Sequence, residues 1–338
     1  MLDIKILKEN IEEITLNLKN RKYDFNNSEF LKLHSERKKF ILQSEDLKNK
    51  KNVLSKEIGI IKSKGGSTTA QKKEVEDINQ QLLKVDALLL EAEKKFSNFM
   101  FDIPNVLDEK VPIGNSEEDN KVLTYSNNEN LSENNSTDTI DHSELGKILK
   151  LFDQETASKM SGARFNILYG EFAELHRAIG SFMIDTHIKE HGYKEVNVPL
   201  IVNNESLIGT GQLPKFKSDL FELKNKENFF LIPTSEVPLT NIFSNKILEE
   251  DDLPIKFTSL STCFRSEAGS YGKDTKGLIR QHQFDKVELV KFTIPSKSCE
   301  ELENLVNDAE RILGLLELPY RKILLCSGDK GFSSSITY

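Results

Sequence analysis

Two long series of residues, spaced alternately three and four apart, constrain the fold more than any other feature of this sequence; seven of ten residues are apolar in the first series and all are apolar in the second. The first series spans residues 30–61 and the second spans residues 75–99. In an α-helix this heptad spacing places the apolar side chains along one side, where they pack against another helix. Residues 64–67, Lys-Gly-Gly-Ser, leave room only for a reversal of the chain. The pattern therefore predicts two helices folded back on each other as an antiparallel hairpin.

Positive charge gathers around the turn of this hairpin. The whole chain has a formal net charge of -8, yet residues 37–73 contain eleven lysines and arginines and only three acidic residues. Each leg should be roughly 50 Å long at 1.5 Å per residue, which is too long to pack wholly against a globular core. We expect the hairpin to project, with its basic segment at the free end. There it would contact the phosphates of a nucleic acid without reading the bases.

Changes of pattern divide the chain into three parts. A helical arm is expected over residues 1–104, because Pro104 closes the second helical series. Residues 105–143 are expected to be a linker, since the segment 126–143 holds five asparagines and no aromatic residue. Residues 144–338 should form a second domain that contains both helices and strands.

The second domain alternates helical and strand-like patterns. Helices are predicted over residues 162–190 and 299–316. A strand over residues 193–202 contains Pro199, and a proline in a strand is typical of an edge or an interface. Further strands are predicted at 229–232, 255–264, 278–290 and 321–326. The fold class is therefore α+β, with an antiparallel sheet flanked by helices. Neither GxGxxG nor GxxxxGK[ST] occurs, which argues against dinucleotide and P-loop folds.

Composition excludes several other classes of protein. No run of about 18 apolar residues is present, so no membrane span is expected, and the first residues are too polar for a signal peptide. The three cysteines follow no CxxC spacing, which suits a soluble protein of the reducing cytoplasm. His187 and His191 lie one helical turn apart but lack a third ligand nearby, so no metal site is expected.

The segment 262–288 carries the chemistry. Two predicted strands flank a loop punctuated by Gly269, Gly272 and Gly277. On the second strand Arg280, Phe284 and Glu288 share parity, so all three should point to one face of the sheet. A guanidinium, an aromatic ring and a carboxylate on one face suit a site for a nucleotide and an amine. The plainer alternative is a hairpin whose charges form ion pairs at the surface.

These residues also resemble a known family. Phe264-Arg265-x-Glu267, a variable loop and then Arg280-x-x-x-Phe284 is the pattern of motif 2 in class II aminoacyl-tRNA synthetases. The longer match over residues 264–270 and 277–284 resembles the seryl-tRNA synthetases in particular. Five other segments resemble that family in the same order, and the N-terminal helical hairpin is also one of its features. The five segments are residues 1–5, 103–105, 162–165, 209–216 and 234–240.

The resemblance implies a role for each matching residue. Arg265 would be the catalytic residue that binds the α-phosphate and the serine carboxylate, Phe284 would stack on adenine, and Arg280 would contact phosphate. The implied ATP-binding positions are Arg265, Ser266, Glu267, Arg280 and Phe284. The implied serine-binding positions are Thr234, Ser235, Glu236, Arg265 and Glu288, with Glu288 on the amino and hydroxyl groups.

The resemblance also implies partners. The substrates would be L-serine, ATP with Mg²⁺, and tRNA(Ser), together with tRNA(Sec), and Pro199 matches the motif 1 proline at the interface of a homodimer. Seryl-adenylate would form by in-line attack of the serine carboxylate on the α-phosphate, with no nucleophilic side chain. The tRNA-binding positions in the arm would be Arg37, Lys38, Lys39, Lys48, Lys50, Lys51, Lys56, Lys62 and Lys64.

Members of this family continue beyond the position that matches Tyr338. Motif 3 and the expected Mg²⁺ ligands belong to that further segment, so the resemblance implies a catalytic domain that is incomplete at its C-terminus. Two alternatives remain open. The chain could be an inactive tRNA-binding paralogue or fragment, or the arm could be a coiled coil for protein association whose lysines only form a solvated face.

Overall fold

The computed structural model describes residues 2–126, 140–268 and 277–338. They form two compact units, the first comprising Met1–Asn120 with Leu325–Thr337 and the second Lys121–Leu324 with Tyr338. Each unit is described by itself below. The predicted glycines at 269 and 272 and most of the polar segment 126–143 lie outside the described residues. The domain limits drawn from the sequence, at residues 104 and 143, stay a prediction.

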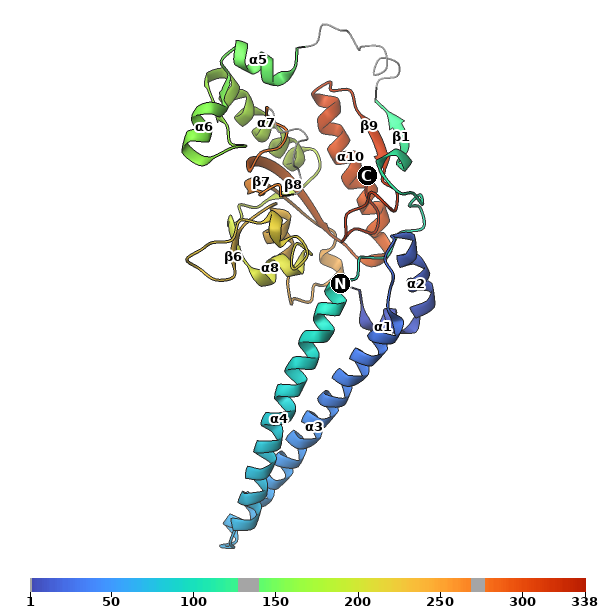
Figure 1. Ribbon diagram of the computed structural model, residues 1–338, viewed down its shortest axis with the longest axis vertical. Helices are drawn as coiled ribbons and strands as arrows, with labels where there is room; N and C mark the ends of the chain where they lie inside the picture. The colour runs from blue at the N-terminus through green and yellow to red at the C-terminus, as the bar shows by residue number, and fades with distance from the viewer. Residues whose placement is uncertain (1, 127–139, 269–276) are drawn as a thin grey trace. The chain divides into compact units, whose positions relative to one another are not determined.

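A helical hairpin dominates the first unit, as the heptads predict (Figure 1). Its helices are α1 (Ile4–Glu9), α2 (Ile11–Asn20), α3 (Asn27–Ser63) and α4 (Thr69–Phe101), followed by the short 3-10 helix η1 (Glu117–Asp119). Every residue of the two heptad series is buried or half-buried in the contact between α3 and α4. Gly65 makes the turn with a positive φ of 75°, a conformation that costs glycine little.

An apolar cluster closes the base of the hairpin. It joins α1 and α2 to the two long helices through buried residues that include Leu7, Leu18, Phe30, Phe96 and Met100. The segment that returns from the far end of the chain is fixed by Arg21, whose guanidinium donates to the backbone oxygens of residues 105, 331 and 334. The arm therefore has a folded base of its own within the first unit.

The second unit is built around the long antiparallel pair β7 and β8. Its helices are α5 (His142–Ile148), α6 (Gln154–Ser161), α7 (Gly170–Lys189), α8 (Asn204–Gly209), α9 (Glu236–Asn241) and α10 (Ser298–Leu315), with 3-10 turns η2 (Lys217–Asp219), η3 (Glu250–Asp252) and η4 (Pro295–Lys297). Its strands are β1 (Lys121–Tyr125), β2 (Phe152–Asp153), β3 (Ile167–Leu168), β4 (Lys194–Glu195), β5 (Ile201–Asn203), β6 (Phe229–Leu231), β7 (Ile255–Phe264), β8 (Gln283–Phe292) and β9 (Arg321–Leu324).

The strands pair in small sheets, as an α+β fold class predicts. One sheet has the order β4-β7-β8, in which β4 is parallel to β7 and β7 is antiparallel to β8. The pairs β1-β9, β2-β3 and β5-β6 are antiparallel. One face of β7 joins a core that contains Leu207, Phe230, Ile232, Leu239 and Phe257. No helix of the described residues is long and apolar enough to cross a membrane.

Three predicted elements differ in extent from the structure. The strand expected over residues 193–202 splits into β4 and β5, because Pro199 has no N–H to donate to a sheet ladder. The helix expected from residue 162 begins at Gly170, since Gly162 ends α6 with a φ of 94°. The strand expected from residue 278 begins at Gln283, so Arg280 lies before β8 and does not share its pleat.

Candidate functional site

The register of β7 against β8 sets out the centre of the site. Phe284, Lys286 and Glu288 alternate along β8 and therefore point to one face of the sheet. Directly opposite them on β7 lie Cys263, Ser261 and Ser259, in that order, and all three are buried. Small residues on one strand leave room above them, so the larger side chains of β8 stand on this face with space around their ends.

A charged triad forms where β8 meets the segment before α9. The Thr234 hydroxyl donates to Oε2 of Glu288 over 2.5 Å, and the Lys286 ammonium lies 2.6 Å from the same oxygen. Lys286 also donates to Thr234 Oγ1 over 2.7 Å. The structure thus brings together Thr234 and Glu288, two of the predicted serine-binding residues. Sequence reasoning missed Lys286, although it has the same parity on β8 as Phe284 and Glu288.

Glu236 adds a second carboxylate to the triad. Although Glu236 keeps exposed surface, burial of its carboxyl group raises its pKa, and the charge of Glu288 raises it further. Lys286 and Arg265 act in the opposite direction. Ser235 differs from its neighbours, because its side chain is fully buried and its hydroxyl has no hydrogen-bond partner among the described residues. The structure therefore does not bring the Ser235 hydroxyl into contact with Thr234 or Glu288.

Arg265 lies beside the aromatic ring of Phe284. The guanidinium carbon is 5.2 Å from the ring centroid, and Nε donates to the backbone oxygen of Pro233 over 3.2 Å. His282 holds the backbone of Arg265 from both sides: its Nδ1 lies 2.9 Å from the Arg265 oxygen, and its own oxygen accepts from the Arg265 N–H. Since a carbonyl can only accept, Nδ1 of His282 must carry the proton. This arrangement fixes the direction of Arg265.

Arg280 reaches the site from the segment before β8, whereas the sequence predicted that it alternates within the strand. It is exposed, and its guanidinium lies 3.4 Å from Oε2 of Glu267. Glu267 has a positive φ of 50°, which is uncommon for a residue with a side chain. Hydrogen bonds from the N–H groups of Ser266 and Ala268 to Asp219 hold the chain on either side of it. Contacts from η2 therefore shape this part of the site, which strand periodicity does not reveal.

The donor set of this face suits a nucleotide. Arg265 and Arg280 offer planar, permanently charged donors of the kind that bind phosphate oxygens, and Phe284 offers a flat ring for a base. Among the described residues, no three histidine, cysteine, aspartate or glutamate side chains gather as ligands for a metal ion. The expectation that Mg²⁺ ligands lie in a further segment stays a prediction.

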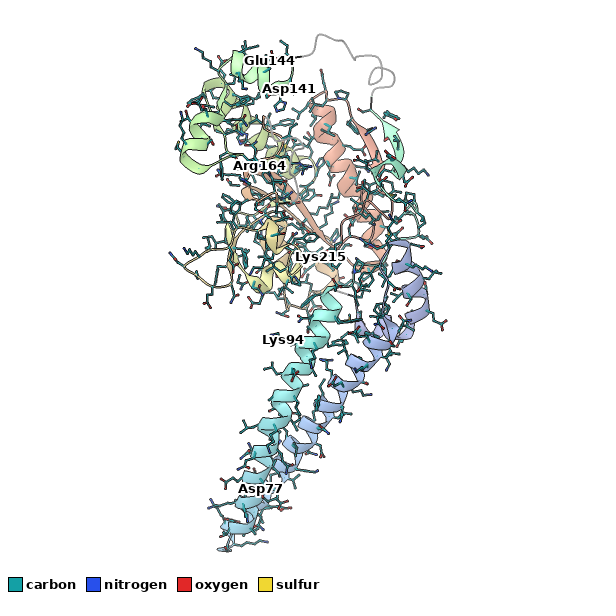
Figure 2. All side chains as sticks on the ribbon, in the orientation of Figure 1. Asp77, Lys94, Asp141, Glu144, Arg164 and Lys215 are labelled. Carbon is teal, nitrogen blue, oxygen red and sulfur yellow. The ribbon has the colours of Figure 1, made fainter. Side chains whose placement is uncertain are left out.

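The nine predicted tRNA-binding residues all belong to α3 or to its C-cap, Lys64. Seven are exposed, while Arg37 and Lys51 are half-buried in the contact with α4. Arg37 lies 3.6 Å from Glu93, and Lys48 and Lys50 are 3.9 and 2.7 Å from Asp86 and Asp46. Within the described part of the chain, the other six form no ion pair: Lys38, Lys39, Lys51, Lys56, Lys62 and Lys64. Figure 2 shows side chains extending from both helices along the arm.

Pro199 lies in the exposed segment between β4 and β5. Leu200 and Ile201 follow it with 39% and 47% of their surface exposed. Exposed apolar side chains at neighbouring positions are common in surfaces that contact another protein. The geometry is compatible with an interface there, which stays a prediction.

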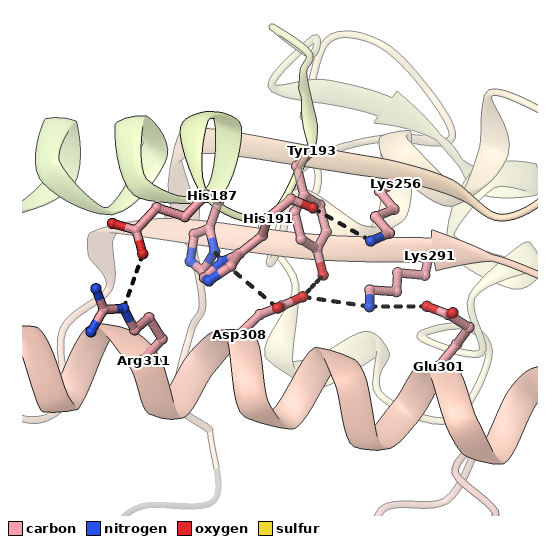
Figure 3. A network of polar contacts seen from close by, with 9 residues as sticks. His187, His191, Tyr193, Lys256, Lys291, Glu301, Asp308 and Arg311 are labelled. Atoms are coloured by element: carbon pink, nitrogen blue, oxygen red, sulfur yellow. Dashed lines mark hydrogen bonds and ion pairs between the residues drawn. The ribbon is translucent and has the colours of Figure 1, made fainter.

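His187 and His191 belong to a buried polar network on the other face of β8 (Figure 3). Their Nδ1 atoms are 3.0 Å apart, and the nearest carboxylate, Asp308 of α10, lies 3.8 Å from His191. Asp308 also accepts from the Tyr193 hydroxyl and pairs with Lys291, which in turn pairs with Glu301 over 3.0 Å. The network joins α7, β8 and α10, so these histidines help to hold the scaffold of the site.

Two family descriptions match separate parts of this chain. Residues 1–107 match the family "Seryl-tRNA synthetase N-terminal domain", and residues 219–338 match "tRNA synthetase class II core domain (G, H, P, S and T)". The chain is 47% identical to the serine–tRNA ligase of Cellvibrio japonicus, over all of its own length and 78% of that protein. It is also 47% identical to the serine–tRNA ligase of Herminiimonas arsenicoxydans, of which it covers 79%.

Solved structures agree with the sequence relatives. The seryl-tRNA synthetase of Pyrococcus horikoshii, crystallised with ATP, matches with a TM-score of 0.79 and 31% identity. That match covers 99% of this chain and 79% of the Pyrococcus horikoshii chain. The cytoplasmic serine–tRNA ligase of Naegleria fowleri, in complex with AMP, has the same fold, with a TM-score of 0.79 at 24% identity.

Proposed function

Because the chain belongs to the seryl-tRNA synthetase family, whose members are serine–tRNA ligases, we propose that it activates L-serine with ATP and transfers the seryl group to tRNA(Ser) and tRNA(Sec). The observation that carries the proposal is the union on one sheet face of the triad Thr234, Lys286 and Glu288 with Arg265 and Phe284. One half of this face suits an amino acid and the other half suits a nucleotide.

Serine would lie at the triad. The carboxylates of Glu288 and Glu236 suit its ammonium group, and the Thr234 hydroxyl and Glu288 suit its own hydroxyl. A site with buried groups that need a hydroxyl partner disfavours alanine, because alanine leaves those groups unpaired. Threonine would be excluded by the space that its extra methyl group requires.

Arg265 would join the two halves of the reaction. Its guanidinium would neutralise charge on the serine carboxylate and on the α-phosphate as the carboxylate attacks in line and pyrophosphate leaves. Phe284 would hold the adenine ring, with Ser266 and Glu267 on the adenine side and Arg280 on phosphate. Bound Mg²⁺ would neutralise phosphate charge. The protein groups that hold it would lie outside the residues described. No side chain of this face needs to act as a nucleophile.

The arm would bind tRNA by charge. Exposed lysines of α3 would contact phosphates, which positions a nucleic acid without reading its sequence. We also propose that the protein works as a homodimer through the segment around Pro199 and that it acts in the cytoplasm, where aminoacyl-tRNA is used.

Amino-acid-dependent exchange of pyrophosphate into ATP tests the activation step; this and the later activity measurements use a chain extended to the full length of its relatives, of which this chain covers 78%. The proposal expects exchange with serine and little or none with threonine or alanine. Exchange that follows threonine or another amino acid would refute the assignment of serine. Salt-sensitive binding of tRNA without exchange for any amino acid, even in the extended chain, would favour the alternative, an inactive tRNA-binding paralogue.

A further inference from the structure

Lys286 contacts two of the groups that would hold serine, Glu288 and Thr234, although the function proposed above gives it no role. Its ammonium lies 2.6 Å from Glu288 Oε2 and donates to Thr234 Oγ1 over 2.7 Å. Lys286 and Glu288 are half-buried, with 30% and 19% of their side chains exposed. A lysine placed in this way must either compete with the ammonium group of the substrate or prepare the site for it.

The contacts of Glu288 favour preparation. Both hydrogen-bonding contacts that Glu288 receives from described side chains, from Thr234 and from Lys286, end on Oε2. The other carboxylate oxygen, Oε1, receives none from the described residues. Two donors on one oxygen fix the rotation of the carboxylate and leave the second oxygen available to a ligand.

The charges around the triad also indicate that Lys286 prepares the site for the substrate. Besides the triad's own Lys286 and Glu288, the charged and titratable groups around it are Glu236 of α9, Arg265 after β7 and the Cys263 thiol of β7. Burial and Glu288 raise the pKa of Glu236, while Lys286 and Arg265 lower it. Without Lys286, only Arg265 would oppose the repulsion between the two carboxylates.

We infer that Lys286 is a positioning residue for the amino acid: it holds Oε2 of Glu288 so that Oε1 remains for the substrate's ammonium, and its charge offsets the repulsion between Glu288 and Glu236. This inference rests on the proposed function, because it assigns the role of Lys286 in the same site. Lysine suits the task, since its compact ammonium presents three donors that can reach a hydroxyl and a carboxylate together.

The test is the pH dependence of serine-dependent pyrophosphate exchange in Lys286→Met. We expect the KM for serine to rise about tenfold or more, as for the loss of a charge-assisted contact, with the KM for ATP nearly unchanged. The acidic limb of kcat/KM for serine should move to higher pH, because loss of the Lys286 charge raises the pKa of Glu236 further. Lys286→Arg keeps the positive charge. The acidic limb of its kcat/KM for serine should therefore stay at the pH seen in the unsubstituted protein, even where the KM for serine rises.

Lys322→Met is the matched control. Lys322 forms an equally half-buried pair with Glu310, at 2.8 Å with 18% and 20% exposed, away from this site on β9. It should leave the KM for serine unchanged. An unchanged or lower KM for serine in Lys286→Met, a parallel rise of the KM for ATP, or an unmoved acidic limb would overturn the inference alone. Absence of serine-dependent exchange in the unsubstituted protein would instead refute the proposed function on which it rests.

Discussion

Glu288 is the residue on which recognition of the amino acid depends most. Its carboxylate is held by Thr234 and Lys286, and only 19% of its side chain is exposed. Glu288→Gln keeps the shape but removes the charge that an ammonium group needs. We expect the KM for serine to rise about 10- to 100-fold, as for the loss of a charged hydrogen bond, with the KM for ATP nearly constant. Steady-state pyrophosphate exchange measures both constants.

Glu190→Gln serves as the control for this change. Glu190 pairs with Arg311 on an exposed surface, with 44% of its side chain exposed, and has no contact with the triad. It should leave both constants as they are. If Glu288→Gln bound serine as well as the unsubstituted protein does, the assignment of Glu288 would be wrong.

Glu236 links the site to stability through pH. Its pKa in the folded protein lies above the ordinary value of 4.5, chiefly because of burial. The folded state therefore binds more protons than the unfolded state between the two pKa values, and the contribution of Glu236 to stability falls as pH rises through that window. Glu236→Gln does not titrate. Its Tm advantage over the unsubstituted protein should grow as pH rises above 4.5.

Thermal melts between pH 4.5 and pH 8 measure this difference. Glu195→Gln, an exposed position on β4, is a suitable control and should show little change with pH. A Tm difference for Glu236→Gln that shrinks with rising pH would show that the ionised carboxylate stabilises the fold, contrary to the sign argued here.

At the scale of single residues, sequence periodicity predicted part of the site. Phe284 and Glu288 do share one face of β8, since a strand alternates strictly. Arg280 does not belong to that strand, because its segment is held by distant partners: the Leu278 N–H donates to His142, and Gln154 donates to the Gly277 oxygen. Tertiary contacts of this kind leave no trace in local spacing.

At the scale of elements, segments with strong periodicity were predicted best and irregular segments were predicted worst. Strand β7 has the predicted limits, residues 255–264, and the heptads predicted α3 and α4. The long strand expected around Pro199 is wrong, because the missing N–H breaks it in two. The path of residues 265–268 depends on contacts with η2, whose short turn has no pattern to recognise.

The docking of α10 on the sheet depends on the buried network of Figure 3. Lys291 has only 4% of its side chain exposed and pairs with both Glu301 and Asp308. Lys291→Met leaves two carboxylates without their cation, and breaking a buried pair by removing one partner costs about 3–5 kcal/mol. Urea unfolding should show a loss of this size.

Arg311→Met breaks an exposed ion pair of the same helix. Its partner is Glu190, and 49% of the arginine side chain is exposed, so the expected loss is about 0–1 kcal/mol. Equal losses for the two variants would mean that burial of Lys291 contributes nothing to the docking of α10.

The arm should bind tRNA through α3 near its turn. Lys56 and Lys62 are exposed there and form no ion pair with a described residue. Reversal of both charges, Lys56→Glu with Lys62→Glu, should raise the KM for tRNA about tenfold or more. It should also reduce the slope of log K against log salt by about 2, one unit for each lost phosphate contact. Serine-dependent pyrophosphate exchange should not change, because it needs no tRNA.

Lys94→Glu is the matched control for the arm. Lys94 is an exposed lysine of α4 on the half of the helix far from the turn, as Figure 2 shows, whereas Asp77 lies nearer the turn. Reversal of the Lys94 charge should raise the KM for tRNA much less than reversal of the Lys56 and Lys62 charges. Equal effects at Lys94 and at the α3 pair would indicate a general effect of net charge in place of a defined surface.

At the scale of the whole molecule, two units carry two tasks. The unit with residues 37–73 holds the basic excess, while the unit with β7 and β8 holds the amino-acid and nucleotide face. Because tRNA binding and serine activation depend on different residues, a change in the arm should weaken tRNA binding and leave serine activation intact. The hairpin can be shortened at a known pair of facing residues, because the Ser44 hydroxyl on α3 donates a hydrogen bond to Asp86 on α4.

The most direct measurement is the attachment of labelled serine to tRNA by the intact protein and by a variant with a shortened arm. Replacing residues 48–82 with Gly-Gly joins the helices three residues beyond the Ser44–Asp86 pair and removes six of the nine predicted tRNA-binding residues. We predict that the intact protein attaches serine and not threonine. The shortened protein should keep serine-dependent pyrophosphate exchange but lose most of its attachment of serine to tRNA. Unchanged attachment by the shortened protein, or attachment of another amino acid by the intact one, would contradict the account.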